Sequence, residues 1–397
     1  MRKIFFAALL CLLLSACRHT ANTPHTTIIV SLDGFRWDYP QLYHTPNLDR
    51  MGTEGVRAVM WPSFPSSTFP NHYTLATGLV PDHHGIVNNT FYDAQSGRTY
   101  AVGDSSSRYD PYFYLGEPIW VTAQKQGVPT ANIHWVGSDV PVHGIYPTYY
   151  HSWEENPQLT YDERVDEALA YLRKPVDERP RLIMLYYPEP DGAGHAGGPY
   201  GDNVRAMVQR LDTLMGRLID GVAQVPDEVN LIITSDHGMT GIDTSRVVRP
   251  SDYLKPEWYI RMVGNRPTSI FSRPEYRDSI RLALQDVPHI SVWEHGHVPA
   301  ALDYGTSSRI GDLIVMPDLG WQFTDNASPA GRGAHGYDPA ETDMQVIFLA
   351  VGPDFKRGYE GEPFRNVDVY SLLAHLLKVK PAATDGSMEK VRALLRE

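Results

Sequence analysis

The sequence predicts an α/β protein with a mostly parallel sheet, helices on both faces of that sheet, and a small α+β insertion. Along most of the chain, short apolar runs alternate with helical patterns. The apolar runs show no alternation of apolar and polar residues, as expected for strands that are buried on both faces. Acidic residues follow three of these runs, where parallel sheets gather their ligands. Between residues 251 and 321 the pattern changes to aromatic residues, prolines and shorter runs, which indicates the insertion.

The N-terminus has the pattern of a secretory signal. A basic pair precedes an apolar stretch over residues 4–14, which is too short to span a bilayer. The following Leu14-Ser-Ala-Cys17 resembles a bacterial lipobox, so residues 1–16 would be removed and Cys17 would carry a lipid. An ordinary signal peptide with a chance cysteine is the alternative. We expect a lipoprotein of the bacterial periplasm, anchored in the outer membrane, with residues 17–25 as a linker.

Composition limits the class of protein. With 42% hydrophobic residues, the 397-residue chain can bury a large core, and we expect residues 26–397 to form one domain that contains the insertion. The 35 basic and 47 acidic side chains give a formal charge of −12, which argues against a nucleic-acid-binding surface. Cys11 leaves with the signal, so the mature chain can form no internal disulfide.

The first half of the chain predicts two extended segments and three helices. Residues 26–32 are β-branched and apolar and end at Asp33. Thr45 and Pro46 then provide an N-cap and a proline at the first helical position, and Gly55 ends that helix. The remaining elements are a helix over 117–126, an extended run over 132–136 and an amphipathic helix over 161–172.

The second half continues this alternation. The predicted strands cover residues 181–187, 231–234 and 345–351. The predicted helices cover residues 203–222 and 366–379. Within the insertion, residues 290–293 and 311–316 are short extended runs. Asp33, Asp191 and Asp236 all follow predicted strands, so we expect them at the carboxyl edge of the sheet.

Several side chains with oxygen or imidazole donors could bind metal. They are Asp33, Thr68, Asp191, His195, Asp236, His237 and His335. This donor set contains no thiolate and suits zinc or a similar divalent ion, and seven ligands are too many for one tetrahedral ion. We therefore expect two zinc ions. Two metals about 3.5–4 Å apart suit in-line displacement at phosphorus, because they stabilise the attacking oxygen and the developing charge.

Each motif taken alone has a simpler interpretation. Asp33-Gly34 is more often a tight turn than a metal site. Three small residues between Asp191 and His195 let both side chains reach one centre, but a flexible loop with a histidine is possible. Asp236-His237 is a stronger signal, because an acid and a histidine buried after a strand need a partner. His335 alone is unremarkable, and the combination favours the metal site.

Thr68 stands just ahead of a helical pattern. The simple interpretation is a helix N-cap, a common role of threonine. The functional interpretation adds an anionic phosphate at the helix start, where backbone N–H groups and the helix dipole favour it. A metal bound to the hydroxyl would lower its pKa and supply an alkoxide nucleophile. The two roles do not exclude each other.

Six motifs occur across nearly all of the mature chain. They are Ser31-Leu-Asp-Gly-Phe-Arg36, Thr68-Phe-Pro-Asn-His-Tyr73, Pro81-Asp-His-His-Gly-Ile86, Glu189-Pro-Asp-Gly-Ala-Gly-His195, Ser235-Asp-His-Gly-Met239 and Ala334-His-Gly-Tyr-Asp338. In content and order they resemble the nucleotide pyrophosphatase/phosphodiesterase family of the alkaline phosphatase superfamily. The resemblance implies an alkaline phosphatase-like fold, with residues 26–397 as the phosphodiesterase domain.

The resemblance also implies roles for individual residues. Asp191, His195 and His335 would hold one zinc. Asp33, Thr68, Asp236 and His237 would hold the other, and Thr68 would be the covalent nucleophile.

Further substrate contacts follow from the same resemblance. Asn89 and the backbone N–H of Phe69 would bind a phosphate oxygen, although Asn89 would also suit a polar turn. Trp135, Trp153 and Tyr186 correspond to positions where aromatic side chains form a nucleobase slot, but aromatic residues are more often part of a core. Other histidines are interpreted as structural, namely His72, His83, His84, His295 and His297.

These observations lead to one expected function and two alternatives. We expect a two-zinc phosphodiesterase that hydrolyses nucleotide pyrophosphates and phosphodiesters to nucleoside 5′-monophosphates through a threonyl-phosphate intermediate. One alternative is a phosphodiesterase for phospholipid headgroups. The other is a non-catalytic zinc-binding protein, which Thr68 and Asn89 argue against because zinc capture needs neither. The expected partners are a small phosphodiester substrate and, through the lipid, a membrane.

Overall fold

A computed structural model describes residues 24–326 and 331–396, so the predicted signal and Cys17 lie outside the described residues. Within that part of the chain nine strands form the main sheet, in the order β18-β2-β17-β8-β1-β7-β5-β6 with β19 beside β2. Their bounds are β1 Thr26–Leu32, β2 Val56–Trp61, β5 Thr130–Ile133, β6 Tyr149–His151, β7 Leu182–Tyr187, β8 Val229–Thr234, β17 Val346–Val351, β18 Tyr359–Glu360 and β19 Phe364–Arg365.

Most neighbouring strands of this sheet are parallel. β1 pairs in parallel with both β7 and β8, and Thr27 lies opposite Leu182 and Asn230. β17 is the exception, because it runs antiparallel to β2 and β8. The mostly parallel sheet predicted from the sequence is therefore confirmed. β1, β7 and β8 end at one edge, so the residues that follow them are brought close together.

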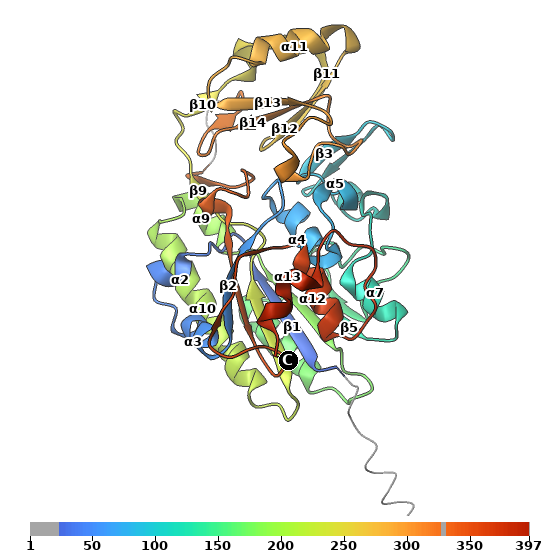
Figure 1. Ribbon diagram of the computed structural model, residues 1–397, viewed down its shortest axis with the longest axis vertical. Coiled ribbons are helices and arrows are strands. Elements are labelled where there is room, and N and C mark those ends of the chain that lie inside the picture. Colours follow the sequence, from blue (N-terminus) through green and yellow to red (C-terminus); the bar gives the residue numbers. More distant parts are fainter. Residues whose placement is uncertain (1–23, 327–330, 397) are drawn as a thin grey trace, which may run out of the picture.

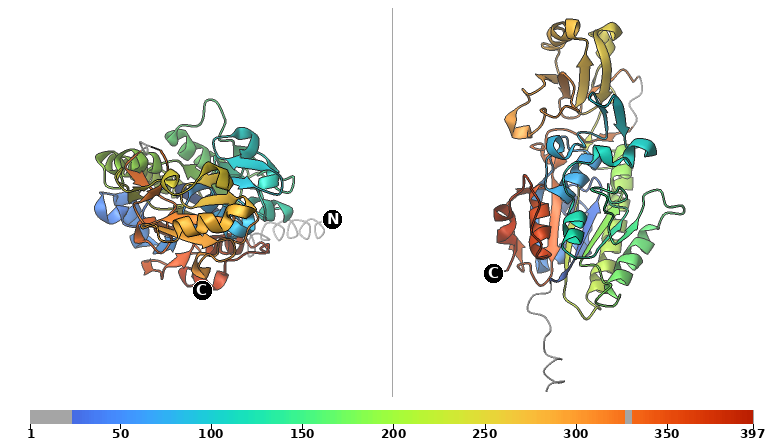
Figure 2. Two further views of the ribbon diagram at one scale, coloured as in Figure 1. Left: turned by 90° about the horizontal axis from the view of Figure 1, so that it is seen from above. Right: turned by 90° about the vertical axis from the view of Figure 1, so that its right-hand side faces the viewer.

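Helices cover both faces of the sheet (Figure 2). Alternate side chains of β1 enter two different cores: Ile28 and Val30 pack in one, and Ile29 packs in the other. The first core lies under α3 (Pro46–Glu54), α8 (Tyr161–Leu172) and α10 (Asp202–Val222). The second lies under α4 (Thr68–Thr77), α7 (Ile119–Lys125) and α12 (Asp368–Leu376). A strand buried on both faces has no polar side, which explains its unbroken apolar run.

Shorter elements complete the chain. The remaining helices are α2 Tyr39–Leu42, α5 Pro81–His84, α6 Ser105–Arg108, α9 Asp191–Gly197, α11 Arg277–Leu284 and α13 Met388–Val391. Short strand pairs are β3 Thr90–Asp93 with β4 Arg98–Ala101, β9 Thr240–Gly241 with β16 Gly333–Ala334, and β10 Val247–Val248 with β15 Gln322–Phe323. No helix within the described ranges is both long and apolar enough to cross a membrane.

Three local predictions differ from the structure. The extended run over 132–136 is wrong in its second half, because β5 ends at Ile133 and His134 takes a left-handed φ of 56°. Thr45 lies at the N-cap of α3 but makes no capping bond. Instead Asp212 of α10 accepts hydrogen bonds from the first amides of α3, at 3.0 Å from Asn47 N. β2 was not predicted, and its buried positions alternate with partly exposed ones near the edge of the sheet.

A second sheet lies above the carboxyl edge of the first (Figure 1). It is antiparallel, with the order β11-β12-β14-β13, and its strands are Tyr259–Gly264, Thr268–Ser272, Leu313–Pro317 and Ile290–Glu294 in that order. The stretch 251–321, which the sequence predicts as an insertion, contains this sheet. Leu313 and Val315 of β14 pack under α11, whereas Ile314 and Met316 join a core of the main sheet. The second sheet is thus fixed to the first by shared apolar packing.

His84 connects α5 to α4, the helix that begins with Thr68. The backbone N–H of Ile86 donates to His84 Nδ1 at 3.2 Å. The ring proton therefore sits on Nε2, which lies 3.1 Å from the carbonyl oxygen of Pro70. Burial lowers the pKa of this histidine from 6.5 to about 3. The native protein holds His84 neutral over a pH range in which the unfolded chain protonates it.

We predict that His84→Asn reduces the acid sensitivity of the protein. Between pH 6.5 and 3 the unfolded wild type binds one proton more at this position than the folded protein. The free energy of unfolding therefore decreases by about 1.4 kcal/mol for each unit by which the pH is lowered. The variant lacks this contribution and keeps an acceptor for Ile86. Urea unfolding at pH 7 and pH 5 measures the difference. His44→Asn, at an exposed position, is the control, and equal pH slopes in both variants would refute the assignment.

Candidate active site

Three carboxylates meet at the edge where β1, β7 and β8 end. Asp33 follows β1 directly, Asp236 lies two residues after β8, and Asp191 begins α9 shortly after β7. Asp33 and Asp236 are buried, with 3% and 0% of their surface exposed. Parallel pairing of the three strands brings these acids together although they are far apart in the sequence.

One group of donors surrounds the ring nitrogen of His237. His237 Nε2 lies 3.2 Å from Asp236 Oδ2 and 3.3 Å from Asp33 Oδ1. Thr68 Oγ1 lies 3.0 Å from the same nitrogen. These are the four residues expected to share one zinc.

A second group surrounds Asp191. Its Oδ1 lies 3.4 Å from His195 Nε2 and 3.7 Å from His335 Nε2. Asp191 and His195 are one helical turn apart on α9, so their side chains share a face. The ring of His335 stacks on that of His237 with centroids 3.6 Å apart. His237 therefore lies within reach of both groups, whereas the resemblance placed it in one.

The three imidazoles are oriented by backbone carbonyls. Nδ1 of His195 donates to Gly333 O at 2.8 Å, and Nδ1 of His335 donates to Ser66 O at 3.0 Å. Nδ1 of His237 donates to Gly238 O at 2.8 Å. Each ring therefore presents an unprotonated Nε2 to the carboxylates. Burial lowers the pKa of all three rings, and this keeps them in the neutral form that binds metal.

The carboxylates carry unbalanced negative charge. Asp33 Oδ1, Asp191 Oδ1 and Asp236 Oδ2 are buried and have no hydrogen-bond partner. Burial and then the neighbouring carboxylates raise the pKa of Asp33 and Asp191. Burial also opposes ionisation of Asp236, but His237 and His72 outweigh it and lower its pKa. In the described chain no lysine or arginine pairs with these acids. Bare oxygens beside free imidazole nitrogens fit a divalent cation.

Thr68 is the first residue of α4. Ser67 occupies the N-cap position and makes no side-chain capping bond, so the interpretation of Thr68 as the cap is wrong. The Thr68 hydroxyl instead faces His237. Helix starts favour anions, and the Thr68 hydroxyl lies where the helix N-terminus meets the candidate metal ligands.

Asn89 and Phe69 are hydrogen-bonded to each other in this structure. The Phe69 N–H, expected to bind a phosphate oxygen, donates to Asn89 Oδ1 at 3.0 Å. Asn89 is held in turn by Asn88, whose Oδ1 accepts from Asn89 N at 2.8 Å. Asn88 Nδ2 donates to Pro267 O at 3.1 Å, in the turn between β11 and β12. The second sheet thus supports this side of the site.

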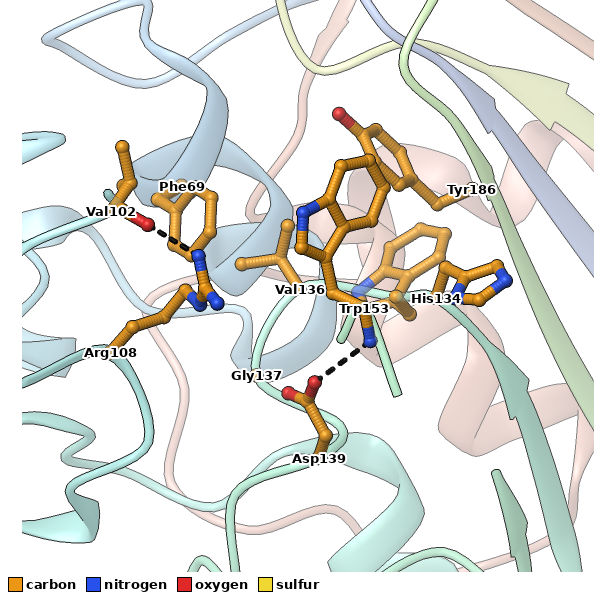
Figure 3. A pocket seen from close by; sticks show the side chains of 10 residues that line it. Phe69, Val102, Arg108, His134, Val136, Gly137, Asp139, Trp153 and Tyr186 are labelled. Atoms are coloured by element: carbon orange, nitrogen blue, oxygen red, sulfur yellow. Dashed lines mark hydrogen bonds between the residues drawn. The ribbon is translucent and has the colours of Figure 1, made fainter. Parts of the chain in front are cut away.

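An aromatic cavity of about 200 Å³ lies next to Thr68. Phe69 stands on one side of it, and Trp153 and Tyr186 stand on the other (Figure 3). Trp135 and Tyr186 are almost fully buried, and the Tyr186 hydroxyl donates to Asp33 Oδ2 at 2.6 Å. Phe69 and Trp153 are only partly buried. The predicted slot residues therefore line one cavity, but Trp135 and Tyr186 are almost fully buried.

Arg108 and Asp139 also line this cavity and were not predicted. Arg108 donates to Val102 O at 2.6 Å, and Asp139 accepts from Trp153 N at 3.1 Å (Figure 3). The acid holds the segment that carries Trp153. No local sequence pattern marks either residue, because Arg108 at the end of α6 and Asp139 in a loop meet only in the fold.

His72 contacts the site, although the sequence indicates only a structural role. It lies one helical turn after Thr68, and its Nδ1 is 2.9 Å from Thr68 O and 3.3 Å from Asp236 Oδ2. Its Nε2 is 2.9 Å from Ser31 Oγ. His72 thus joins α4 to the ends of β1 and β8. The four-residue spacing from Thr68 is the signal that could have found it.

Sequence comparisons place the chain among known proteins. The model of the family described as type I phosphodiesterase / nucleotide pyrophosphatase matches residues 27–338. Bovine ectonucleotide pyrophosphatase/phosphodiesterase family member 3 is 34% identical over 386 residues, which are 93% of this chain and 44% of the bovine protein. A pyrophosphatase/phosphodiesterase of Schizosaccharomyces pombe is 34% identical over 94% of this chain and 80% of its own length. The chain thus spans less than half of the bovine relative.

Solved structures are similar over almost the whole chain. Human ectonucleotide pyrophosphatase/phosphodiesterase 5 has a TM-score of 0.89 at 33% identity, covering 94% of this chain and 100% of the human chain. The same coverage, identity and TM-score hold for an inactive threonine-to-alanine variant of murine ectonucleotide pyrophosphatase/phosphodiesterase 5 in complex with AMP.

We predict opposite effects of Asp33→Asn with and without zinc. Ionised Asp33 is repelled by Asp236 and Asp191, so its replacement stabilises the zinc-free protein at pH 7 by about 1–3 kcal/mol. The raised pKa means that the zinc-free wild type gains stability as the pH falls from 7, and the variant lacks this gain. Added zinc stabilises the wild type more than the variant.

Thermal unfolding with a chelator and with excess zinc measures both effects. Asp177→Asn, at an exposed position, is the control and changes neither condition. Equal stabilisation of wild type and Asp33→Asn by zinc would exclude Asp33 as a ligand.

Proposed function

Because the chain belongs to the type I phosphodiesterase / nucleotide pyrophosphatase family, we propose that it is a zinc-dependent hydrolase of nucleotide pyrophosphates and phosphodiesters. The resemblance noted in the sequence and the alkaline phosphatase-like fold are both confirmed. The observation that carries the proposal is the position of Thr68. Its hydroxyl lies 3.0 Å from His237 Nε2, at a helix start and beside an aromatic cavity.

We assign the site to two zinc ions. Asp191, His195 and His335 would hold one. Asp33, Thr68, Asp236 and His237 would hold the other. Bound there, the metals would lower the pKa of the Thr68 hydroxyl and offset the negative charge that develops around phosphorus.

The first chemical step is proposed to use Thr68 as the nucleophile. As an alkoxide, its proton already lost to water, Thr68 attacks the α-phosphorus in line with the leaving group. The Oγ–P bond forms, the bond from phosphorus to the leaving oxygen breaks, and that oxygen takes the electron pair. Phe69 N–H and Asn89 Nδ2 then donate to a non-bridging oxygen once their mutual bond opens. The product of this step is a threonyl phosphodiester and the free leaving group.

The second step returns the enzyme to its starting state. Water attacks the same phosphorus, one water proton returns to Thr68 Oγ1, and the other is released. A nucleoside 5′-monophosphate leaves. His72 supports both steps by fixing the Thr68 carbonyl at 2.9 Å, which holds the first turn of α4 against Ser31 and Asp236.

The aromatic cavity favours nucleotides as the substrate class. Phe69 and Trp153 are partly buried aromatic residues on opposite sides of a cavity of about 200 Å³, and flat bases stack on aromatic rings. The AMP complex of the murine neighbour supports the same class. A phospholipid headgroup has no flat ring to match these faces. Comparing kcat/KM for ATP and lysophosphatidylcholine tests this preference.

We also propose that the protein is a periplasmic lipoprotein held in the outer membrane through Cys17. This rests on the lipobox-like Leu14-Ser-Ala-Cys17 alone. His25 directly precedes β1, whose first residue lies at the end of the strand opposite the site, so a tether attached there would leave the cavity open to solutes. Metabolic labelling with a radioactive fatty acid, compared between wild type and Cys17→Ala, tests this.

We predict that Thr68→Ala lowers turnover of ATP and of bis-p-nitrophenyl phosphate by roughly 10³-fold or more, because it removes the nucleophile. Zinc content stays near that of the wild type, since the carboxylates and imidazoles remain. Steady-state kinetics and elemental analysis of the purified protein measure both. Thr53→Ala, an exposed position on α3, is the control. Undiminished turnover in Thr68→Ala would rule out the mechanism.

We predict that Asn89→Ala lowers kcat by about 10²–10³-fold with little change in KM, because the donor acts on charge that develops in the transition state. Asn89→Asp is expected to be worse than Asn89→Ala, since a carboxylate repels the phosphate. Kinetics with one substrate and all three proteins suffice. A rise in KM alone would place Asn89 in substrate binding instead.

A further inference from the structure

An arginine of the second sheet touches the site. Arg266 lies in the turn between β11 and β12, and its Nε donates to the backbone oxygen of His335 at 2.7 Å. The guanidinium lies over the ring of Tyr337, 5.6 Å from its centroid. His335 is one of the candidate ligands. The turn that carries Arg266 also supports Asn88 through Pro267, so it reaches the site at two points.

The charge of Arg266 has no counter-charge in the described chain. Neither terminal nitrogen has a hydrogen-bond partner there, and no carboxylate pairs with the side chain. Arg36 is the contrasting case, because this buried arginine forms ion pairs with Asp38 and Asp343, both at 2.8 Å. The Arg266 side chain is only partly buried, so an anion that enters from solvent can pair with this cation.

A polar cavity lies next to this arginine. Its volume is about 420 Å³, and it is lined by Ser67, Asn88, Asn89, Thr90, His195, Gly264, Asn265 and His335. Arg266 directly follows Asn265 and holds the carbonyl of His335. His335 lines this cavity, so Arg266 contacts one of its walls.

The two cavities flank the nucleophile. Ser67, just before Thr68, lines the polar cavity, and Phe69, just after it, lines the aromatic one. If the nucleoside occupies the aromatic cavity, the α-phosphate lies at Thr68 and the leaving group extends into the polar cavity. The cavity offers amides, hydroxyls and imidazoles, and Arg266 is the cation beside it.

We propose that Arg266 binds a phosphate of the leaving group and thereby favours nucleotides whose leaving group is pyrophosphate over diesters whose leaving group is an alcohol or phenol. This assignment rests on the proposed function. As the bond from the α-phosphorus to the bridging oxygen breaks, that oxygen takes the electron pair. The terminal N–H groups of Arg266 donate to the departing phosphate.

Two substrates with the same nucleoside but different leaving groups distinguish this role from a general loss of activity. Thymidine 5′-triphosphate releases pyrophosphate, and the p-nitrophenyl ester of thymidine 5′-monophosphate releases p-nitrophenolate. For Arg266→Gln we expect kcat/KM to fall roughly 10- to 100-fold for the triphosphate and less than about threefold for the ester. Arg266→Lys keeps the charge and should recover part of the triphosphate activity. Arg261→Gln, on β11 with partners Thr99 and Tyr92, is the matched control.

Calorimetric titration of the zinc-loaded proteins with pyrophosphate is a second readout. Arg266→Gln should bind pyrophosphate more weakly than wild type, and Arg261→Gln should not. Equal losses on both substrates would mean that Arg266 only holds the His335 loop, and unchanged triphosphate activity would also overturn the assignment. If Arg266→Gln does not fold, Arg266→Lys is compared in the same way. A wild type that turns over neither substrate contradicts the proposed function, while the titration still tests Arg266.

Discussion

The structure depends on the burial of like charges at one edge of the main sheet. Asp33, Asp191 and Asp236 each bring a bare oxygen to this edge, and the groups beside them are neutral histidines whose other nitrogens donate to backbone carbonyls. Such an arrangement is unfavourable in isolation. It becomes favourable with a cation, and this explains why so much of the surrounding structure serves to orient single atoms.

The orientation is provided by elements from both sheets. β1, β7 and β8 fix the acids through their parallel register, and α4 fixes Thr68 through His72. The turn between β11 and β12 holds Asn88 and the His335 carbonyl. Because Ile314 and Met316 of the second sheet pack into a core of the main sheet, the turn cannot shift without disturbing apolar packing. The second sheet is therefore part of the site's framework.

Much of this could be predicted from the sequence, for a physical reason. Parallel strands place the residues after them at one edge, so unbroken apolar runs followed by Asp33 and Asp236 are informative without any structure. The spacing from Asp191 to His195 is likewise readable as one helical turn. What could not be predicted depends on contacts between distant segments. The capping of α3 by Asp212, the roles of Arg108 and Asp139, and the approach of Arg266 to His335 leave no local pattern. The left-handed backbone conformation of His134 was not predicted, because glycine and asparagine are the residues that usually indicate such a conformation in a sequence.

The hydrogen bond between Phe69 N–H and Asn89 Oδ1 means that the helix start is already occupied by an internal competitor. An incoming oxygen must displace a neutral amide carbonyl to gain the Phe69 donor. A neutral oxygen would replace one neutral hydrogen bond to Phe69 N–H with another, with no gain in free energy. An anionic oxygen forms a stronger, charge-assisted hydrogen bond. Asn89 is then free to rotate its Nδ2 donor toward that oxygen. Through this bond Asn89 would favour an anionic over an uncharged oxygen at the start of α4.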